Sequence, residues 1–268
     1  MRQVALTVRA DALEAVLDRL LPLVPQGVHE APAADGAIAL DVYGPGPSLE
    51  ELKAAGGDAL LGAAQGEAPD DAAERRLLAL SALPPVAGVV VRPSGSPAPG
   101  PGVLDVVIDS PGGAFGSGTH PTTVMCLQLL MALEPGGAFA DLGCGTGVLA
   151  ITAALRGWRP VLGIDHEALG VEAARANAGR NGVELELAHA DLLTLDPPAA
   201  PTVSANVPPA VHEHVAARLP AEVSRLIVSG VAQDAIDGVT AGYERAGLSR
   251  EGALSEGGWA AALLVRGA

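Results

Sequence analysis

From residue 138 onward, short apolar segments alternate with longer segments of helical periodicity. The apolar segments predict strands at 139–142, 161–165, 185–188, 203–206 and 226–231. The stretches between them predict helices at 148–156, 167–181 and 210–219. Such alternation is typical of a mostly parallel sheet with helices on both faces, so we expect a doubly wound α/β fold here. Ligands of these sheets bind beyond the carboxyl ends of the strands.

The first 66 residues follow another pattern, in which strands and helices predict a small ferredoxin-like α+β unit. The expected elements are a strand at 3–9, a helix over 13–21, strands at 28–31 and 37–43, a helix after Ser48 and a weak strand at 59–63. Ser48 followed by Glu51 forms a capping box, and Gly56 is placed to end that helix.

A connector is expected between the two parts, over residues 67–102. It contains a predicted helix at 70–83, a strand at 86–92 and a loop rich in Pro, Gly and Ser at 93–102. The predicted domains are therefore a small unit at 1–66, this connector, and an α/β domain at 103–268 that begins with a strand at 104–108.

The strongest local motif is Asp-Leu-Gly-Cys-Gly-Thr-Gly at 141–147, which follows an apolar strand and opens a helix. Gly143, Gly145 and Gly147 allow a sharp turn and leave room for a ligand where a Cβ would intrude. Amides at the start of the next helix favour a carboxylate or phosphate. A tight strand-to-helix turn without a ligand is the alternative interpretation.

Two acidic residues end the next two strands. Asp165 is placed to accept the hydroxyl hydrogens of a ribose, which indicates an adenosine-bearing ligand, although it could instead cap the following helix. Asp191 suits the edge of an adenine, with a solvated carboxylate as the alternative.

The turn Asn206-Val207-Pro208-Pro209 favours a methyl donor over a dinucleotide. The strict dinucleotide fingerprint fails from Gly143, while its looser form, with a final Ala, is met from Gly145. Methyl transfer needs a neutral nitrogen held in line with the methyl group. The Asn206 side-chain oxygen, with the carbonyl of Val207 or Pro208, can accept hydrogen bonds from such a nitrogen.

A second motif, residues 112–123, places one apolar anchor, Phe115, among four glycines and could fold over the cofactor. Thr119 or His120 followed by Pro121 resembles a helix cap and first turn, so His120 is interpreted as a capping or packing residue and not as a catalyst. Cys144 is interpreted as a small buried residue, and no spacing typical of metal ligands is found.

Charge and composition limit the classes of partner molecule that we expect. Acidic residues outnumber basic ones 31 to 16, a formal charge of -15, which opposes direct binding to nucleic acid or to an anionic membrane and favours a basic protein. Only two cysteines occur, no signal-peptide core follows Met1, and no apolar stretch is long enough to span a bilayer. We therefore expect a cytoplasmic protein, as a monomer.

Residues 114–123 (Ala-Phe-Gly-Ser-Gly-Thr-His-Pro-Thr-Thr) together with 141–150 (Asp-Leu-Gly-Cys-Gly-Thr-Gly-Val-Leu-Ala) closely resemble the family of ribosomal protein L11 methyltransferases. The resemblance is clear from 108 to 230. It implies a seven-stranded, Rossmann-like class I methyltransferase domain, S-adenosylmethionine as cofactor, and methylation of lysine side chains or the N-terminus of ribosomal protein L11. It also implies that the small N-terminal domain docks on that substrate.

The residues that the family uses match Thr123, Gly143, Asp165 and Asn206, which contact the cofactor or the target amine. With Phe115, Asp141, Gly145 and Asp191 these form the predicted cofactor site, and Asn206 is the predicted catalytic residue.

Departures from the family pattern leave alternatives open. Val207-Pro208-Pro209 replaces two aliphatic residues and Ala, and it looks more like the Asn-Pro-Pro-Tyr turn of glutamine and other amino-group methyltransferases. The linker at 71–76 lacks the family's aromatic residues. A glutamine-type methyltransferase, a nicotinamide-dependent oxidoreductase and a non-catalytic factor that binds the ribosomal protein therefore stay open.

Overall fold

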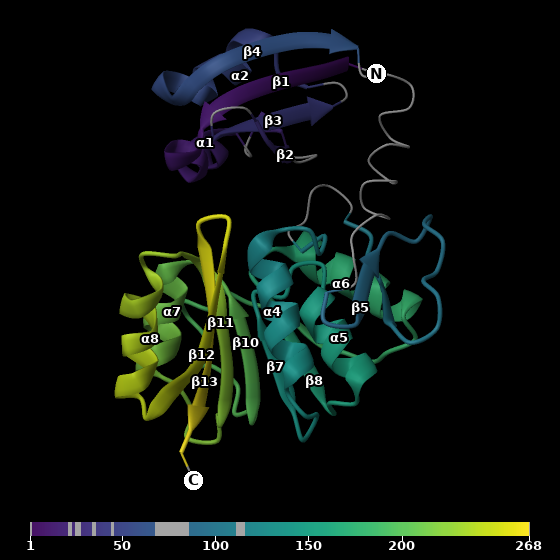
Figure 1. Ribbon diagram of the computed structural model, residues 1–268, viewed down its shortest axis with the longest axis vertical. Coiled ribbons are helices and arrows are strands. Elements are labelled where there is room, and N and C mark those ends of the chain that lie inside the picture. Colours follow the sequence, from purple (N-terminus) through teal and green to yellow (C-terminus); the bar gives the residue numbers. More distant parts are fainter. Residues whose placement is uncertain are drawn as a thin grey trace. The chain divides into compact units, whose positions relative to one another are not determined.

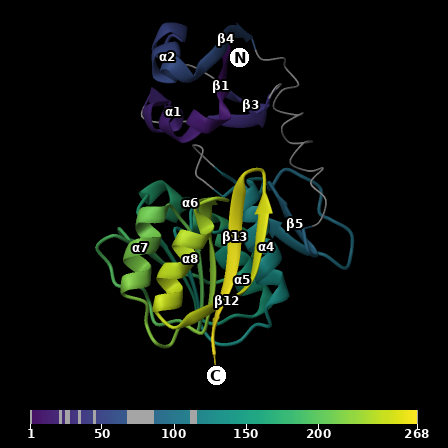
Figure 2. The ribbon, with the colours of Figure 1, turned by 60° about the vertical axis from the view of Figure 1, so that its left-hand side comes forward.

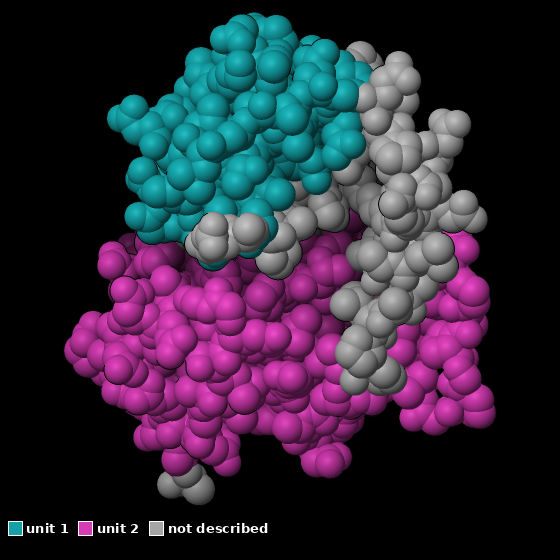
Figure 3. Space-filling model, turned by 45° about the horizontal axis from the view of Figure 1, so that its top comes forward, with its two compact units in different colours: residues 1–76, 111–113 teal, residues 77–110, 114–268 magenta. Residues whose placement is uncertain are grey.

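The computed structural model describes residues 2–20, 23–24, 28–33, 36–43, 46–67, 86–110 and 116–267. The chain divides into two compact units, Met1–Arg76 with Pro111–Gly113, and Leu77–Ser110 with Ala114–Ala268, which are coloured separately in Figure 3. The predicted connector helix at 70–83 and the anchor Phe115 lie outside the described residues.

The first unit contains a four-stranded sheet with the strand order β2-β3-β1-β4, in which every pair is antiparallel. Its elements are β1 (Arg2–Arg9), α1 (Leu13–Leu20), β2 (His29–Pro32), β3 (Ala37–Tyr43), α2 (Leu49–Gly56) and β4 (Leu60–Glu67). Val4, Leu6 and Val8 alternate along β1 and are fully buried, so one face of the sheet forms a core with the helices. The predicted capping box is confirmed, because Ser48 Oγ accepts from Glu51 N and Glu51 Oε2 accepts from Ser48 N at 2.8 Å.

The second unit is built on a seven-stranded sheet with the order β12-β13-β11-β10-β7-β8-β9. Its strands are β7 (Phe139–Leu142), β8 (Val161–Asp165), β9 (Glu186–His189), β10 (Thr202–Asn206), β11 (Arg225–Ala232), β12 (Leu248–Glu256) and β13 (Trp259–Arg266). Pairs from β9 to β11 are parallel, and β13 runs antiparallel to both of its neighbours. The prediction of a mostly parallel, doubly wound sheet is confirmed.

Helices cover both faces of this sheet (Figures 1 and 2). They are α4 (Pro121–Ala132), α5 (Val148–Arg156), α6 (Ala168–Arg180), α7 (Pro209–Ala217) and α8 (Ile236–Arg245). Phe139 of β7 packs in a core with α4, α5 and α6, whereas Ala140 and Leu142 pack in a second core with α7 and α8. Successive side chains of one strand point to opposite faces, so β7 contributes to both cores.

The order of the sheet fixes where a ligand can bind. From β7 the chain moves outward through β8 and β9, and from β10 it moves the other way to β11. The carboxyl ends of β7 and β10 therefore flank the point where the strand order reverses, which is where open α/β sheets form a crevice. The glycine motif follows β7, Asp165 ends β8 and Asn206 ends β10.

A small parallel pair, β5 (Val89–Arg92) and β6 (Leu104–Val107), belongs to the same unit. The salt bridge between Arg92 and Asp105, at 2.7 Å, links the two strands. Within the described part of the chain, no helix is both long and apolar enough to cross a bilayer.

Candidate functional site

The glycine motif turns the chain by left-handed backbone conformations that L side chains rarely adopt. Gly143, Gly145 and Gly147 have φ values of 73°, 50° and 84°. The amides of Gly143 and Cys144 both donate to the carbonyl of Ile164 on β8, at 2.8 and 3.0 Å. The loop is therefore bound to the end of the neighbouring strand.

Gly143 is also required by the space around it. A Cβ at this position would lie 2.6 Å from Val207 Cγ1, well inside van der Waals contact. Val207 follows Asn206, so the absence of a side chain at Gly143 lets the glycine loop and the Asn206 turn lie against each other.

Asp141 anchors the elements on either side of the loop. Its side chain is 1% exposed, Oδ1 accepts from Ser204 Oγ at 2.6 Å and Oδ2 accepts from Ala150 N at 3.2 Å. Burial raises the pKa of this carboxyl to about 7, against the lowering effect of those two hydrogen bonds. Asp141 thus joins β10 to the first turn of α5, and direct contact with a cofactor stays a prediction.

Asp165 lies at the tip of β8 and reaches back to the glycine loop. Its Oδ2 accepts from Gly145 N at 2.7 Å and its Oδ1 accepts from Glu167 N at 2.9 Å. The N-cap of α6 is Glu167, which makes no side-chain cap bond of its own, so Asp165 also holds the chain where it enters this helix. A carboxylate has about four acceptor sites, so Asp165 retains capacity for the hydroxyl groups of a ligand.

Asp191 comes two residues after β9 and is exposed. Its Oδ1 accepts from Leu193 N at 2.9 Å. The preceding amide, Ala190 N, donates to the carbonyl of Asp165 at 2.9 Å, which ties this loop to the tip of β8. The structure therefore brings Asp191 to the same edge of the sheet as Asp165.

The start of α4 meets the end of β10 through a chain of polar contacts. His120 is the N-cap of α4, with its Nδ1 accepting from Thr122 N, and Pro121 follows at the first helical position, which confirms the predicted cap. His120 Nδ1 also lies 2.7 Å from Thr122 Oγ1, and Asn206 Nδ2 donates to that same oxygen at 3.3 Å. Burial lowers the pKa of His120.

This chain of contacts sets which end of the Asn206 amide is free. Because the backbone N–H of Thr122 donates to His120 Nδ1, that ring nitrogen carries a lone pair and accepts the Thr122 hydroxyl hydrogen as well. The oxygen of Thr122 then accepts from Asn206 Nδ2, and Asn206 Oδ1 is left over.

Two orphaned polar atoms mark this cluster. Among the described residues, five buried side-chain polar atoms lack a hydrogen-bond partner, and two of them are Thr123 Oγ1 and Asn206 Oδ1. An unsatisfied buried polar atom costs about 1–3 kcal/mol, so each such atom needs an explanation, and a bound ligand is one. Both atoms belong to residues that the sequence predicts for the site.

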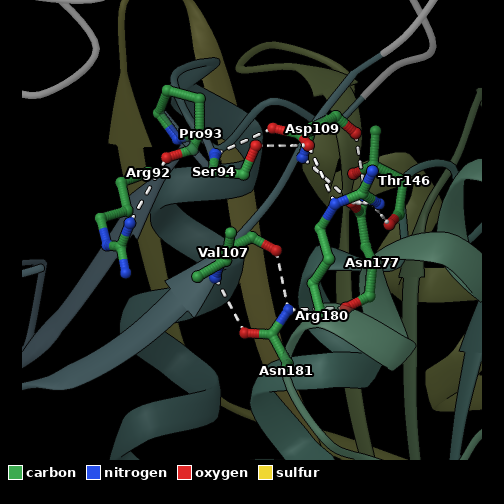
Figure 4. Close-up of polar contacts among 9 residues, drawn as sticks. All are labelled: Arg92, Pro93, Ser94, Val107, Asp109, Thr146, Asn177, Arg180 and Asn181. Atoms are coloured by element: carbon green, nitrogen blue, oxygen red, sulfur yellow. Dashed lines mark hydrogen bonds and ion pairs between the residues drawn. The ribbon is translucent and has the colours of Figure 1, made fainter. Parts of the chain in front are cut away.

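A side-chain network joins the C-terminal end of α6 to β6 and to the glycine loop (Figure 4). Asn181 of the loop after α6 pairs with both backbone groups of Val107, at 2.8 and 2.7 Å, as a neighbouring strand would. Asn177 makes the same pair of bonds to Asp109 and also donates to Thr146 O at 3.0 Å. The glycine loop is thus tied to the strand that precedes the second motif.

The described end of the second motif reaches the glycine loop directly. Thr146 Oγ1 donates to Gly116 O at 2.7 Å. A Cβ on Gly116 would lie 2.6 Å from Thr146 Oγ1. Cys144 is 4% exposed and burial raises its pKa, so the interpretation of this cysteine as a buried packing residue is confirmed.

The residues that support the Asn206 turn from behind were not predicted from the sequence. The amide of Val207 donates to Ser229 O at 3.1 Å, and a Cβ on Gly230 would lie 2.6 Å from Val207 N and O. The pairing of β11 with β13 shifts register at this point. A Ser-Gly pair inside an otherwise apolar strand was the available signal, because glycine within a strand often marks a bulge or a close backbone approach.

Comparison with solved structures shows the same fold. A crystal structure of ribosomal protein L11 methylase from Lactobacillus delbrueckii subsp. bulgaricus superposes with a TM-score of 0.60 at 22% sequence identity, over 67% of this chain and 95% of that one. At this level of identity the likeness concerns the fold alone.

Comparison with curated sequences gives closer matches. A ribosomal protein L11 methyltransferase of Symbiobacterium thermophilum is 38% identical over 176 residues, covering 63% of this chain and 57% of the relative. One of Geobacter metallireducens is 37% identical over 183 residues, covering 67% of this chain and 60% of the relative. The chain thus matches less than two thirds of the length of either relative.

The model of one protein family, described as ribosomal protein L11 methyltransferase (PrmA), matches residues 87–266. This match spans the glycine loop, the tip of β8 and the Asn206 turn. The chain therefore belongs to the ribosomal protein L11 methyltransferase (PrmA) family.

Proposed function

We propose that this chain is an S-adenosylmethionine-dependent N-methyltransferase that modifies amino groups of a basic protein, ribosomal protein L11, at lysine side chains or at its N-terminus. The observation that carries the proposal is the position of Asn206 Oδ1, a buried acceptor without a partner, beside a glycine loop at the switch point of the sheet. Family membership and the names of the curated relatives support the reaction and the target.

The residues present fit this cofactor. The turn through Gly143 and Gly145 leaves backbone close to the ligand position, and Asp165 keeps acceptor capacity for ribose hydroxyls. We place Asp191 at the adenine edge and Thr123, with its unpartnered Oγ1, beside the reacting end. When bound, S-adenosylmethionine supplies an electrophilic methyl group on a sulfonium.

The role of Asn206 follows from the orientation of its amide. With Nδ2 engaged by Thr122, Oδ1 accepts an N–H of the incoming amine and turns the nitrogen lone pair toward the methyl group. The second acceptor predicted at the carbonyl of Val207 or Pro208 is not supplied by Pro208, because that oxygen accepts from Val211 N at 3.0 Å and from His212 N at 3.3 Å at the start of α7. In this scheme the amine arrives neutral and its surplus proton leaves to water after transfer.

The formal charge of -15 favours a basic substrate over a nucleic acid. We propose that the small N-terminal unit docks that substrate and that the protein works in the cytoplasm as a monomer. We also propose that Phe115, which lies outside the described residues, helps to cover the cofactor.

Mass spectrometry of ribosomal protein L11, incubated with the purified chain and S-adenosylmethionine, tests the reaction and the target together. The expected result is a gain of whole methyl masses on lysine or on the N-terminal amine. Methylation of glutamine amides would support the glutamine-type alternative instead. Stable binding to the ribosomal protein with no added mass at any cofactor concentration would contradict the proposal that this chain is an enzyme.

The Asn206 amide provides a sharper test. We expect Asn206→Leu to lower kcat by about 10²- to 10³-fold, as loss of one positioned donor or acceptor does at other transfer sites, while the Kd for S-adenosylmethionine changes less than about twofold. Thr122→Val, which removes the hydroxyl that holds the amide, should lower kcat by a smaller factor, and Thr122→Ser should restore it. Equal activity in Thr122→Val and wild type would refute this orientation of the amide.

The pH dependence distinguishes the two classes of amine. Since only the neutral amine reacts, kcat/KM should rise with pH and level off near the pKa of the target, about 7.7–8.0 for an N-terminal amine and about 10.4 for lysine. Initial rates with peptide substrates between pH 6 and 10 measure this. A flat profile across that range would contradict the selection of a neutral amine from solution.

A further inference from the structure

A buried polar chain lies behind the Asn206 turn, and the proposed mechanism does not use it. His212 of α7 is 1% exposed and Tyr243 of α8 is fully buried. His212 Nδ1 lies 2.8 Å from Tyr243 Oη, and His212 Nε2 lies 2.8 Å from the carbonyl oxygen of Ser229. The two rings meet edge to face, with centroids 5.8 Å apart. Helices α7 and α8 lie side by side on this face of the sheet (Figure 2).

The contacts fix the state of the histidine. A carbonyl oxygen only accepts hydrogen bonds, so His212 Nε2 must carry a proton to bind Ser229. Burial lowers the pKa of His212 to about 4, against the raising effect of the backbone at Ser229 and Val207. The ring is therefore neutral near pH 7, its Nδ1 carries a lone pair, and the Tyr243 hydroxyl donates to it.

Ser229 connects the His212–Tyr243 pair to the Asn206 turn. Its carbonyl oxygen accepts from Val207 N at 3.1 Å as well as from His212 Nε2. The next residue, Gly230, has a φ of 84° and packs so closely on the Val207 peptide that it has no room for a Cβ. On the other side, Ser229 Oγ donates to Ala260 O at 2.8 Å. The irregular stretch of β11 at Ser229 and Gly230 therefore fixes the Val207 peptide. His212 in turn fixes that stretch through its hydrogen bond to the Ser229 carbonyl.

We propose that His212 is a positioning residue for the methyl-accepting site, with its ring oriented by the hydrogen bond from Tyr243. Through Ser229 it fixes the peptide of Val207, and so the direction in which the adjacent Asn206 side chain faces the incoming amine. The inference rests on the function proposed above. A histidine that merely filled the core would contribute to folding but not to the orientation of the acceptor.

Tyr243→Phe keeps the ring and removes the hydroxyl that donates to His212 Nδ1 and orients the imidazole. We expect kcat to fall about tenfold, because small errors in the position of reacting groups cost rate steeply, while the Kd for S-adenosylmethionine stays within about twofold of wild type. The matched control is Thr240→Val on the same helix, which removes a buried hydroxyl bonded only to Asp237 O among the described contacts. The control should leave kcat unchanged.

Variants of the histidine separate donation from bulk. His212→Gln keeps an amide N–H that reaches toward Ser229, whereas His212→Met keeps only apolar volume. We expect His212→Gln to retain more of kcat than His212→Met at similar thermal stability. Long-range proton–nitrogen NMR of the wild-type imidazole should show the proton on Nε2.

Three results would overturn the positioning role: a proton on Nδ1, wild-type kcat in folded Tyr243→Phe, or an equal loss of kcat in Tyr243→Phe and Thr240→Val. If wild type binds S-adenosylmethionine but methylates no basic protein, the proposed function fails and the positioning role fails with it. If wild type is active and Tyr243→Phe is equally active, only the positioning role fails.

Discussion

The site depends on one close contact, that of Gly143 with Val207. Because Gly143 has no side chain and adopts a left-handed conformation, the loop after β7 can lie directly against the turn after β10. Both amides at the start of this loop donate to the single carbonyl of Ile164, which sets the loop at the height of the β8 tip. The three strand ends that build the site are therefore positioned together, and a side chain at Gly143 would disturb them all.

Around this contact, most buried polar groups are hydrogen-bonded to one another and, among the described residues, an acceptor atom is left without a partner. The carboxylate of Asp141 accepts from Ser204 and from Ala150 and so anchors β10 to α5. In the hydrogen-bonded series His120, Thr122 and Asn206, the His120 ring accepts from the Thr122 hydroxyl, and the Thr122 oxygen accepts from the Asn206 amide nitrogen. The amide oxygen of Asn206 is what remains. The proposed function uses this atom, since an amide oxygen that is already hydrogen-bonded would have less capacity to accept from a substrate.

The strands, helices and caps that lie close in sequence could be predicted from it. The bounds of β7, α5 and β8 follow from apolar periodicity and from glycines at their ends, and the cap of α4 follows from His120 and Pro121. The place of Asp165 at the tip of β8 could be predicted because this residue directly ends an apolar strand. The capping box of α2 depends on residues only three positions apart.

Interactions between distant segments could not be predicted in this way. Asn177 and Asn181 lie far from Asp109 and Val107 in sequence, and nothing local distinguishes these asparagines from solvated ones. β12 is mostly exposed and lacks an alternating apolar pattern, so its place beside β13 depends on pairing alone. The bonds of His212 require the fold to exist before its partners are near.

Calorimetric titration with S-adenosylmethionine, of wild type and of Asp165→Ala, tests the central claim most directly. The account predicts that wild type binds one equivalent and that loss of the Asp165 carboxylate weakens binding about tenfold or more, since a hydrogen bond to a charged group contributes about 1.5–3 kcal/mol. Absence of binding by the folded wild-type chain, or equal affinity in the two proteins, would contradict the claim that these strand ends hold the cofactor.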